Sequence, residues 1–280
     1  PLVGGVISDF EMSQEIMRHF LRKLSGGSAF MSYGKAVVGV PSNLTEVERK
    51  SVEDAVMGAG VFEPYVIDEP LAAALGARLP VEEPTANMIV DIGGGTTEIA
   101  IISMAGTVTS KSLKIAGDKL NEDIMRFVRD EFKLAIGEPT AEEIKATIGS
   151  AIPLEQKLEM AVRGRDMTTG LPKEILIKDT QIRAAMSKSL RSIVESVREV
   201  LEISPPELAG DILRRGIHLC GGGSLLRGID VLLSRDLSVV SAVVEDPLTC
   251  VARGTGIAIE NLEKYLPFLE NPLKPKEIKL

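Results

Sequence analysis

Aromatic residues and cysteine are scarce in this sequence of 280 residues. It has no tryptophan, 3 tyrosines and 7 phenylalanines, and its only cysteines are Cys220 and Cys250. Two cysteines are too few for a disulfide framework or for a zinc site built from thiolates. The sequence therefore indicates a reducing compartment, and we expect the protein in the cytoplasm.

Long apolar runs and an excess of positive charge are also absent. No run approaches the roughly 20 residues that a membrane-spanning helix requires. The 32 lysines and arginines are outnumbered by 40 aspartates and glutamates, so the net charge is −8. This balance argues against a nucleic-acid partner. The 44% of hydrophobic residues is ordinary for a globular protein with one large or two modest domains.

Short apolar segments alternate with amphipathic ones, which predicts an α/β fold. Strands are expected at residues 35–40, 65–67, 87–90, 98–102 and 217–220. Helices are expected at residues 12–24, 71–79 and 180–201, and from residues 45, 118, 140 and 246 onward. Thr45 and Thr140 are each followed three residues later by glutamate, which matches the capping-box pattern. Asp118 is a candidate N-cap.

The middle of the chain changes character. Apolar and polar residues alternate at 158–162 and 175–177, and the turn-rich stretch 164–172 separates the two runs. This pattern predicts a β-hairpin in a small α+β subdomain. The tail at 267–280, which contains prolines and lysines, is expected to be poorly ordered.

The first of two glycine turns carries the strongest chemical signal. It occupies residues 91–98 (DIGGGTTE), between two predicted strands, and contains Gly93, Gly94 and Gly95. Without side chains there, backbone N–H groups can approach a polyphosphate. Asp91 could hold a hydrated Mg²⁺, and Thr96 offers a hydroxyl at the same place. A glycine run alone would favour a tight hairpin turn, but the polar residues around this one favour phosphate binding.

The second turn occupies residues 220–224 (CGGGS), between a predicted strand and a helix, and contains Gly221, Gly222, Gly223 and Ser224. Such a turn can bind an anion or the sugar of a nucleotide, or it can simply allow a helix to pack closely on a strand. The residues leave these alternatives open. Two such units, about 130 residues apart, suggest a site assembled from two places in one sheet, or from two loops that face one ligand.

These motifs resemble those of a known family. The first turn looks like the second phosphate loop of the actin, sugar-kinase and heat-shock-chaperone ATPase superfamily, and residues 220–227 (CGGGSLLR) look like its adenosine loop. A finer match is to the MreB family of bacterial actins. It rests on residues 67–76 (IDEPLAAALG), 115–118 (IAGD), 205–209 (PPELA) and 246–254 (DPLTCVARG), and the resemblance runs to about residue 262.

The resemblance implies an actin-like α/β fold with ATP and Mg²⁺ between two lobes, each with a mixed sheet flanked by helices. The first lobe would be partial and would comprise residues 1–86 and 247–266. Residues 87–117 and 189–246 would form the second lobe, and residues 118–188 would form its small outer subdomain.

The resemblance also implies roles for individual residues. Glu69 would orient the attacking water with help from Thr96, and Asp91 would hold Mg²⁺ through water. The other expected nucleotide contacts are Gly93, Gly94, Gly95, Gly117, Glu142, Glu143, Ile144, Lys145, Gly221, Gly222, Gly223, Ser224 and Leu225. From the residues alone, an interaction of Glu69 with the dipole of the helix that follows it is favoured over a catalytic role, and Asp68 beside it fits the same interaction.

One motif of the superfamily is missing. Its first phosphate loop has an Asp-x-Gly-Thr pattern near the N-terminus, and no such pattern precedes residue 91. The sequence begins at Pro1 rather than methionine. We therefore expect a fragment of a longer product, without the N-terminal hairpin of the first lobe.

Residues 26–33 (GGSAFMSY) place Phe30 and Met31 in a glycine-bounded loop after a predicted helix. An exposed apolar tip could enter the headgroup region of a membrane, aided by Arg22 and Lys23. A loop that folds Phe30 onto its own domain fits the sequence about as well. The resemblance implies membrane insertion, because the family's hydrophobic loop occupies this position.

The resemblance implies a cell-shape-determining cytoskeletal protein. Such a protein binds ATP, hydrolyses it slowly and self-associates into filaments. It would lie at the inner face of the cell membrane and organise cell-wall synthesis with the cell-wall elongation proteins. A sugar kinase and a chaperone-type ATPase remain as alternatives on the same fold. The first would need a substrate-binding insertion and a catalytic aspartate, and the second a peptide-binding domain; neither is evident in the sequence.

Overall fold

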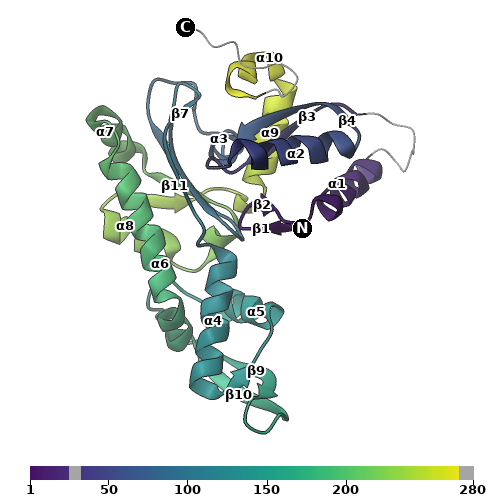
Figure 1. Cartoon of the computed structure of the whole chain (residues 1–280). Helices are drawn as coiled ribbons and strands as arrows, with labels where there is room; N and C mark the ends of the chain where they lie inside the picture. The colour runs from purple at the N-terminus through teal and green to yellow at the C-terminus, as the bar shows by residue number, and fades with distance from the viewer. Residues whose placement is uncertain (25–32, 271–280) are drawn as a thin grey trace.

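A computed structural model of the chain describes residues 1–24 and 33–270. A central sheet lies between two groups of helices (Figure 1). The helices α2 (Glu46–Gly58), α3 (Glu69–Gly76) and α9 (Cys250–Glu260) lie towards one end of the molecule. Towards the other end lie α4 (Gly117–Phe132), α5 (Glu138–Ile148) and the hairpin of β9 (Glu159–Asp166) and β10 (Pro172–Lys178).

The central sheet has five strands in the order β12-β11-β5-β6-β7. These are β5 (Asn87–Ile92), β6 (Thr97–Ser103), β7 (Gly106–Leu113), β11 (Ile217–Cys220) and β12 (Ser241–Val243). β11 runs parallel to both β5 and β12, whereas β5, β6 and β7 form an antiparallel meander. The two predicted strands on either side of the first glycine turn are present as β5 and β6, and they pair antiparallel.

Both faces of this sheet are covered at β5 and β6, which explains why these two strands are mostly apolar and almost completely buried, whereas the edge strand β7 is polar. Met88 and Val90 of β5 belong to one core cluster, with residues of α4 and of α6 (Asp179–Glu202). Ile89 lies between them in sequence and belongs to a second cluster, with residues of α3 and α9. Successive side chains of a strand point to opposite faces, so one strand contributes to two cores.

A second, parallel pair of strands is formed by β3 (Tyr33–Val40) and β4 (Val61–Asp68), with α2 between them in sequence. α2 begins with the predicted capping box, because Thr45 accepts from the backbone N–H of Glu48 and the Glu48 side chain returns to the N–H of Thr45. The elements β1 (Leu2–Val3), β2 (Val6–Ile7) and α1 (Phe10–Leu24) precede this pair.

The remaining elements are short helices and one short strand. They are β8 (Leu134–Ala135), α7 (Pro206–Arg215), η1 (Gly222–Leu225), α8 (Ile229–Leu237), η2 (Pro247–Thr249), α10 (Leu262–Tyr265) and η3 (Leu266–Phe268). The hairpin predicted for the middle of the chain is confirmed, since β9 and β10 pair antiparallel from Glu159 and Lys178 to Arg165 and Pro172.

Two predicted helix starts are wrong. α5 begins at Glu138 with Gly137 as its N-cap, so Thr140 lies inside the helix and forms no capping box. Pro139 fixes the first turn earlier, because its ring already has a helical φ and its missing N–H needs no partner there. α4 begins at Gly117 with Ala116 as its N-cap, so Asp118 is an inner residue of the first turn.

Two further boundaries also differ from the predictions. α3 begins at Glu69, where Pro70 can occupy its first turn, and ends at Gly76 rather than near residue 79. The start of the C-terminal tail is ordered, because Leu269 is buried and Glu270 exchanges backbone hydrogen bonds of 2.9 Å with Val66. Phe30 and Met31 lie outside the described residues. Within residues 1–24 and 33–270, no helix has the length and apolar character to cross a bilayer.

Candidate functional site

The two glycine turns lie side by side at one end of the central sheet. β11 pairs parallel to β5 with Cys220 opposite Asp91, so both strands lead into their turns at the same edge. Gly221 has φ +79, and a Cβ atom on it would lie 2.3 Å from Oδ1 of Asp91. A side chain at Gly223 would similarly meet Ile92 at 2.3 Å. Glycine is therefore required for close packing in the second turn, whatever it binds.

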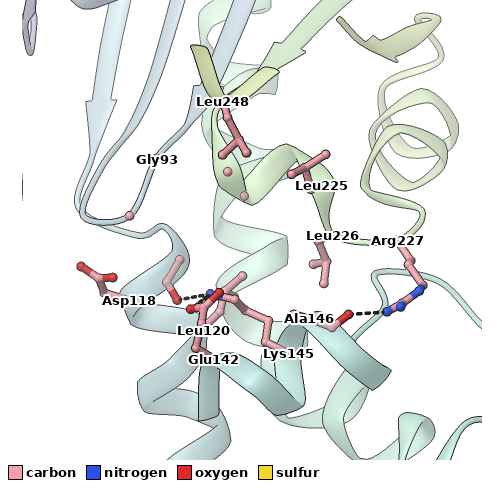
Figure 2. Close-up of a pocket in the computed structure, with 14 residues that line it drawn as sticks. Gly93, Asp118, Leu120, Glu142, Lys145, Ala146, Leu225, Leu226, Arg227 and Leu248 are labelled. Atoms are coloured by element: carbon pink, nitrogen blue, oxygen red, sulfur yellow. Dashed lines mark hydrogen bonds and ion pairs between the residues drawn. The ribbon is translucent and has the colours of Figure 1, made fainter. Parts of the chain in front are cut away.

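Both turns border one cavity of about 370 Å³ (Figure 2). Gly93 and Gly94 line it from the first turn, and Gly222 and Gly223 line it from the second. The rest of the lining is Gly117, Asp118 and Leu120 from α4, Glu142, Lys145 and Ala146 from α5, and Leu225, Leu226, Arg227 and Leu248. The cavity thus lies at the edge of the sheet where the strand order places two loops, the usual location of a ligand in an α/β protein.

One side of the cavity carries a hydrogen-bonded polar group. Nζ of Lys145 donates to Oε2 of Glu142 at 2.7 Å and to the carbonyl oxygen of Gly117 at 3.1 Å. Nδ2 of Asn121 donates to the same Glu142 oxygen at 2.7 Å. Partial burial alone would raise the pKa of Glu142, but the hydrogen bonds from Lys145 and Asn121 outweigh it and lower that pKa. The side therefore presents an ionised carboxylate beside a fixed ammonium group.

The facing side of the cavity carries three leucines, Leu225, Leu226 and Leu248, and also Arg227, whose guanidinium donates to the carbonyl oxygen of Ala146 at 3.0 Å (Figure 2). Leu225 and Leu248 are 55% and 67% exposed although both line the cavity. The backbone fixes the position of Leu248, because Gly221 N donates to the carbonyl of the adjacent Pro247 at 2.9 Å. Arg253 donates to the carbonyl oxygens of Glu245 and Asp246 in the same segment. Exposed leucines in a cavity suit a flat apolar group such as a nucleobase.

The N-terminus of α4 meets the first glycine turn directly. Gly117 N donates to the carbonyl of Gly93 at 3.1 Å, and Asp118 N donates to the carbonyl of Gly94 at 2.8 Å. Two of the unpaired N–H groups of the helix start are thus satisfied by the turn, which fixes the turn against the helix.

A cluster of carboxylates lies behind the first turn. Asp91 pairs with Glu98 across β5 and β6, and burial followed by the charge of Glu98 raises the pKa of Asp91 to about 6. Burial, and then the charges of Asp91, Glu98 and Asp68, raises the pKa of Glu69 to about 8. Burial also raises the pKa of Glu98, although a hydrogen bond from Ser112 lowers it in part. The raised pKa values mean that the ionised forms of these carboxyl groups repel one another, and a cation at this place would relieve that repulsion.

The far side of the first turn is backed by the turn between β1 and β2. A Cβ atom on Gly95 would lie 3.1 Å from Cα of Gly4, and one on Gly5 would lie 3.2 Å from Cγ2 of Thr96. Thr96 is accordingly buried. Gly95 and Thr96 face this turn and are not part of the cavity lining.

The structure brings together about half of the predicted site residues. Those that line the cavity are Gly93, Gly94, Gly117, Glu142, Lys145, Gly222, Gly223 and Leu225. Those outside the lining are Glu69, Asp91, Gly95, Thr96, Glu143, Ile144, Gly221 and Ser224. Ile144 is fully buried in the first core cluster, so its side chain faces away from the cavity.

Sequence reasoning missed several lining residues, namely Asp118, Leu120, Ala146, Leu226, Arg227 and Leu248. Leu226 and Arg227 belong to residues 220–227, which resemble the adenosine loop, but the resemblance assigns only residues 221–225 to the site. Leu248 lies within residues 246–254, one of the segments that carry the family resemblance, but only the tertiary structure places that segment over the second turn.

The residues present fit a magnesium ion held mainly by water. Among residues 1–24 and 33–270, no group of three or more His, Cys, Asp or Glu side chains is arranged to hold a metal. Mg²⁺ keeps several waters and takes few protein oxygens, so Asp91 alone at the strand end suits it.

The fold and the arrangement of its turns define an actin-like protein. The chain belongs to the MreB/Mbl family, whose model matches residues 1–267. It is 43% identical over 264 residues to the cell shape-determining protein Mbl of Bacillus subtilis, covering 94% of this chain and 79% of that protein. It is 44% identical over 265 residues to the cell shape-determining protein MreB of Escherichia coli, covering 95% and 76%.

Solved structures give the same result. MreB5 of Spiroplasma citri bound to ADP superimposes with a TM-score of 0.89 at 38% identity, covering 95% of this chain and 80% of that one. The same protein bound to AMPPNP gives a TM-score of 0.88. A MamK double helical filament gives 0.79 at 23% identity, covering 93% and 80%, which supports the fold alone. The expected actin-like fold and family are confirmed.

Proposed function

We propose that this chain is a cell-shape-determining cytoskeletal protein that binds ATP and Mg²⁺ at the two glycine turns and self-associates into filaments. The observation that carries the proposal is the single cavity bordered by both turns. The MreB/Mbl relationship supports it, as do the ADP and AMPPNP bound to MreB5. The sugar-kinase and chaperone alternatives have no such support.

In this proposal, each side of the cavity would bind a different part of the nucleotide. Leu225 and Leu248 would pack on the base, and Glu142 and Lys145 would bind the ribose hydroxyls. The backbone N–H groups of the first turn would bind phosphate oxygens, where the missing side chains of Gly93 and Gly94 leave room. Asp91 would hold Mg²⁺ through water. The cation would offset the negative charge that surrounds this carboxylate.

Hydrolysis would be slow and would depend on Glu69 and Thr96. Glu69 directly follows β4 as the first residue of α3, where its carboxylate would accept a hydrogen bond from the attacking water, and Thr96 would help to fix that water. Phosphoryl transfer needs positioning and charge stabilisation more than covalent chemistry by the protein. The charges of Asp91 and Glu98 help to keep Glu69 protonated in the absence of a cation, and a protonated Glu69 could not act as a base.

The binding proposal is tested by filling the cavity. A Cβ atom on Gly94 would lie 3.5 Å from Oδ1 of Asp118, an ordinary contact, and circular dichroism of the variant Gly94→Val checks that it folds. We expect it to weaken binding of a fluorescent ATP analogue by at least about tenfold, because the side chain occupies the phosphate position. Gly256→Val is the control, since nothing lies within 4 Å of a Cβ there. Equal affinities in both variants would contradict the proposed site.

Membrane attachment is part of the proposal, at the inner face of the cell membrane. The last turns of α1 carry Phe20 and Leu24, 58% and 83% exposed, together with Arg22 and Lys23. Apolar side chains beside basic ones are typical of a surface that enters anionic headgroups. Phe30 and Met31 follow in sequence. We expect filaments on anionic liposomes with ATP, and partnership with the cell-wall elongation proteins.

We also propose the division of the chain into two lobes and an outer subdomain at the expected boundaries. The two core clusters on opposite faces of the sheet support it, because the second cluster combines Tyr65 and Leu71 with Ala258 and Tyr265 from the other end of the chain. Limited proteolysis with and without ATP would test whether cleavage falls at these boundaries.

A further inference from the structure

A second hollow lies between α6, α8 and the segment after α5, and its volume is about 380 Å³. None of its lining residues lines the cavity between the glycine turns. It is therefore a separate place in the molecule, to which the proposed function assigns no role.

The buried part of this hollow is apolar. Ala151, Leu190 and Leu232 line it, and each is less than a tenth exposed. They come from three different segments, so the hollow is formed where the loop at residue 151 meets the two helices. A surface of this kind offers an apolar side chain a place out of water.

The more exposed part of the lining carries arginines. Nε of Arg235 lies 2.7 Å from Oδ1 of its neighbour Asp236. Nη1 of Arg183 lies 3.4 Å from Oδ2 of Asp179, whose side chain is almost completely buried. This buried carboxylate positions the Arg183 guanidinium beside the hollow, but at 3.4 Å it makes a long contact and leaves other N–H groups available.

The third arginine that lines the hollow is Arg191. Its Nε donates to the carbonyl of Ser187 at 3.3 Å. Throughout the described ranges 1–24 and 33–270, no carboxylate lies within 4.0 Å of its guanidinium nitrogens. Of the three guanidinium groups that line the hollow, two have a carboxylate neighbour and that of Arg191 has none, so the hollow carries an excess of positive charge in a chain whose net charge is −8.

We propose that this hollow binds an acidic segment of a partner protein, with a carboxylate on Arg191 and an adjacent apolar side chain against Leu190 and Leu232. The charge of the lining is complementary to carboxylates, and an arginine can bind both oxygens of one carboxylate at once. A free anion would gain nothing from the apolar part of the lining. A volume of about 380 Å³ holds a few side chains rather than a folded domain.

The experiment uses the full chain and a fluorescein-labelled peptide, Gly-Glu-Leu-Glu-Leu-Glu-Gly, with fluorescence anisotropy at physiological ionic strength. We expect saturable binding, and a loss of about fivefold or more in Arg191→Glu, the effect of one partly desolvated ion pair changed to repulsion. Lys188→Glu is the matched control, because it changes the charge equally on the same helix but lies outside the lining. It should leave the affinity unchanged.

Three results would overturn the proposal. The first is absence of saturable binding by a chain whose circular dichroism is normal. The second is an equal loss in Arg191→Glu and Lys188→Glu, which would show general attraction of charge. The third is equal binding of the peptide with serine in place of leucine, together with its displacement by inorganic phosphate, which would assign the hollow to a free anion. None of these readouts depends on nucleotide binding.

Discussion

Gly254 and the carbonyl oxygen of Ala72 are in such close contact that a Cβ atom on Gly254 would lie 1.7 Å from that oxygen. Gly76 has the reciprocal relationship with α9, since its Cβ would lie 1.8 Å from the carbonyl oxygen of Cys250. Helices α3 and α9 therefore cross with their backbones in contact. This crossing joins two helices that are far apart in the sequence, and it helps to hold the segment that carries Leu248 beside the cavity.

The first prediction follows from this contact. Gly254→Ala should destabilise the fold by about 3 kcal/mol or more, because the collision is with backbone and cannot be relieved by a rotamer change. Gly256→Ala, on the same helix and in open space, should be neutral or stabilising by up to about 1 kcal/mol. Urea denaturation measures both. Similar stabilities for the two variants would show that the helices can separate without cost.

The second prediction concerns the pH dependence of Glu69. Burial and neighbouring carboxylates raise its pKa from 4.5 to about 8 in the folded protein. Between these values the folded chain retains a proton that the unfolded chain releases, so ionisation of Glu69 opposes folding increasingly as pH rises. Glu69→Gln removes that effect.

The free energy of unfolding of Glu69→Gln relative to the unsubstituted protein should therefore increase from pH 5 to pH 8. We expect a change on the order of 1 kcal/mol, reduced by the partial exposure of the side chain. Denaturant unfolding in EDTA at both pH values measures it. A difference that stays constant would mean that Glu69 is not protonated at neutral pH.

The third prediction concerns Lys145, whose ammonium group contacts both Glu142 and the carbonyl of Gly117. Lys145→Met should reduce affinity for ATP by about tenfold, because Glu142 loses a charged partner and the cavity loses a positive charge. Lys119→Met is the control, since Lys119 forms similar ion pairs on α4 with Glu122 and Asp123 but does not line the cavity. Isothermal titration calorimetry measures both.

The fourth prediction concerns Leu248, whose substitution should change the affinity for ATP with little effect on the stability of the protein. Leu248→Ser should weaken ATP binding by about fivefold to tenfold, since it removes apolar surface that the base would cover. It should change stability little, because the side chain is already 67% exposed. Leu266→Ser is a control at another exposed leucine, outside the cavity. A variant with unchanged affinity would place the base elsewhere.

Several features could be predicted from local sequence because local chemistry decides them. The capping box at Thr45 needs only a hydroxyl and a glutamate three residues apart, and it formed as predicted. The same reasoning failed at Thr140, where Pro139 started the helix earlier. The hairpin of β9 and β10 was predicted from alternation and an intervening turn, which again are short-range properties.

The candidate site was predictable in its turns but not in its lining. Gly93 and Gly222 could be assigned because glycine runs after strands are visible in the sequence. Leu248 could not be assigned, because its place over the cavity depends on Arg253 and on the crossing of α3 with α9.

The sequence by itself determined the alternating elements, the two glycine turns and the family, since each depends on residue types at fixed spacings. Only the tertiary structure decided that Asp91 and Cys220 lie opposite each other on neighbouring strands, and which side chains complete the cavity. The physical reason is distance along the chain. Contacts between residues more than a hundred positions apart depend on how whole helices and sheets pack, and no local pattern records that packing.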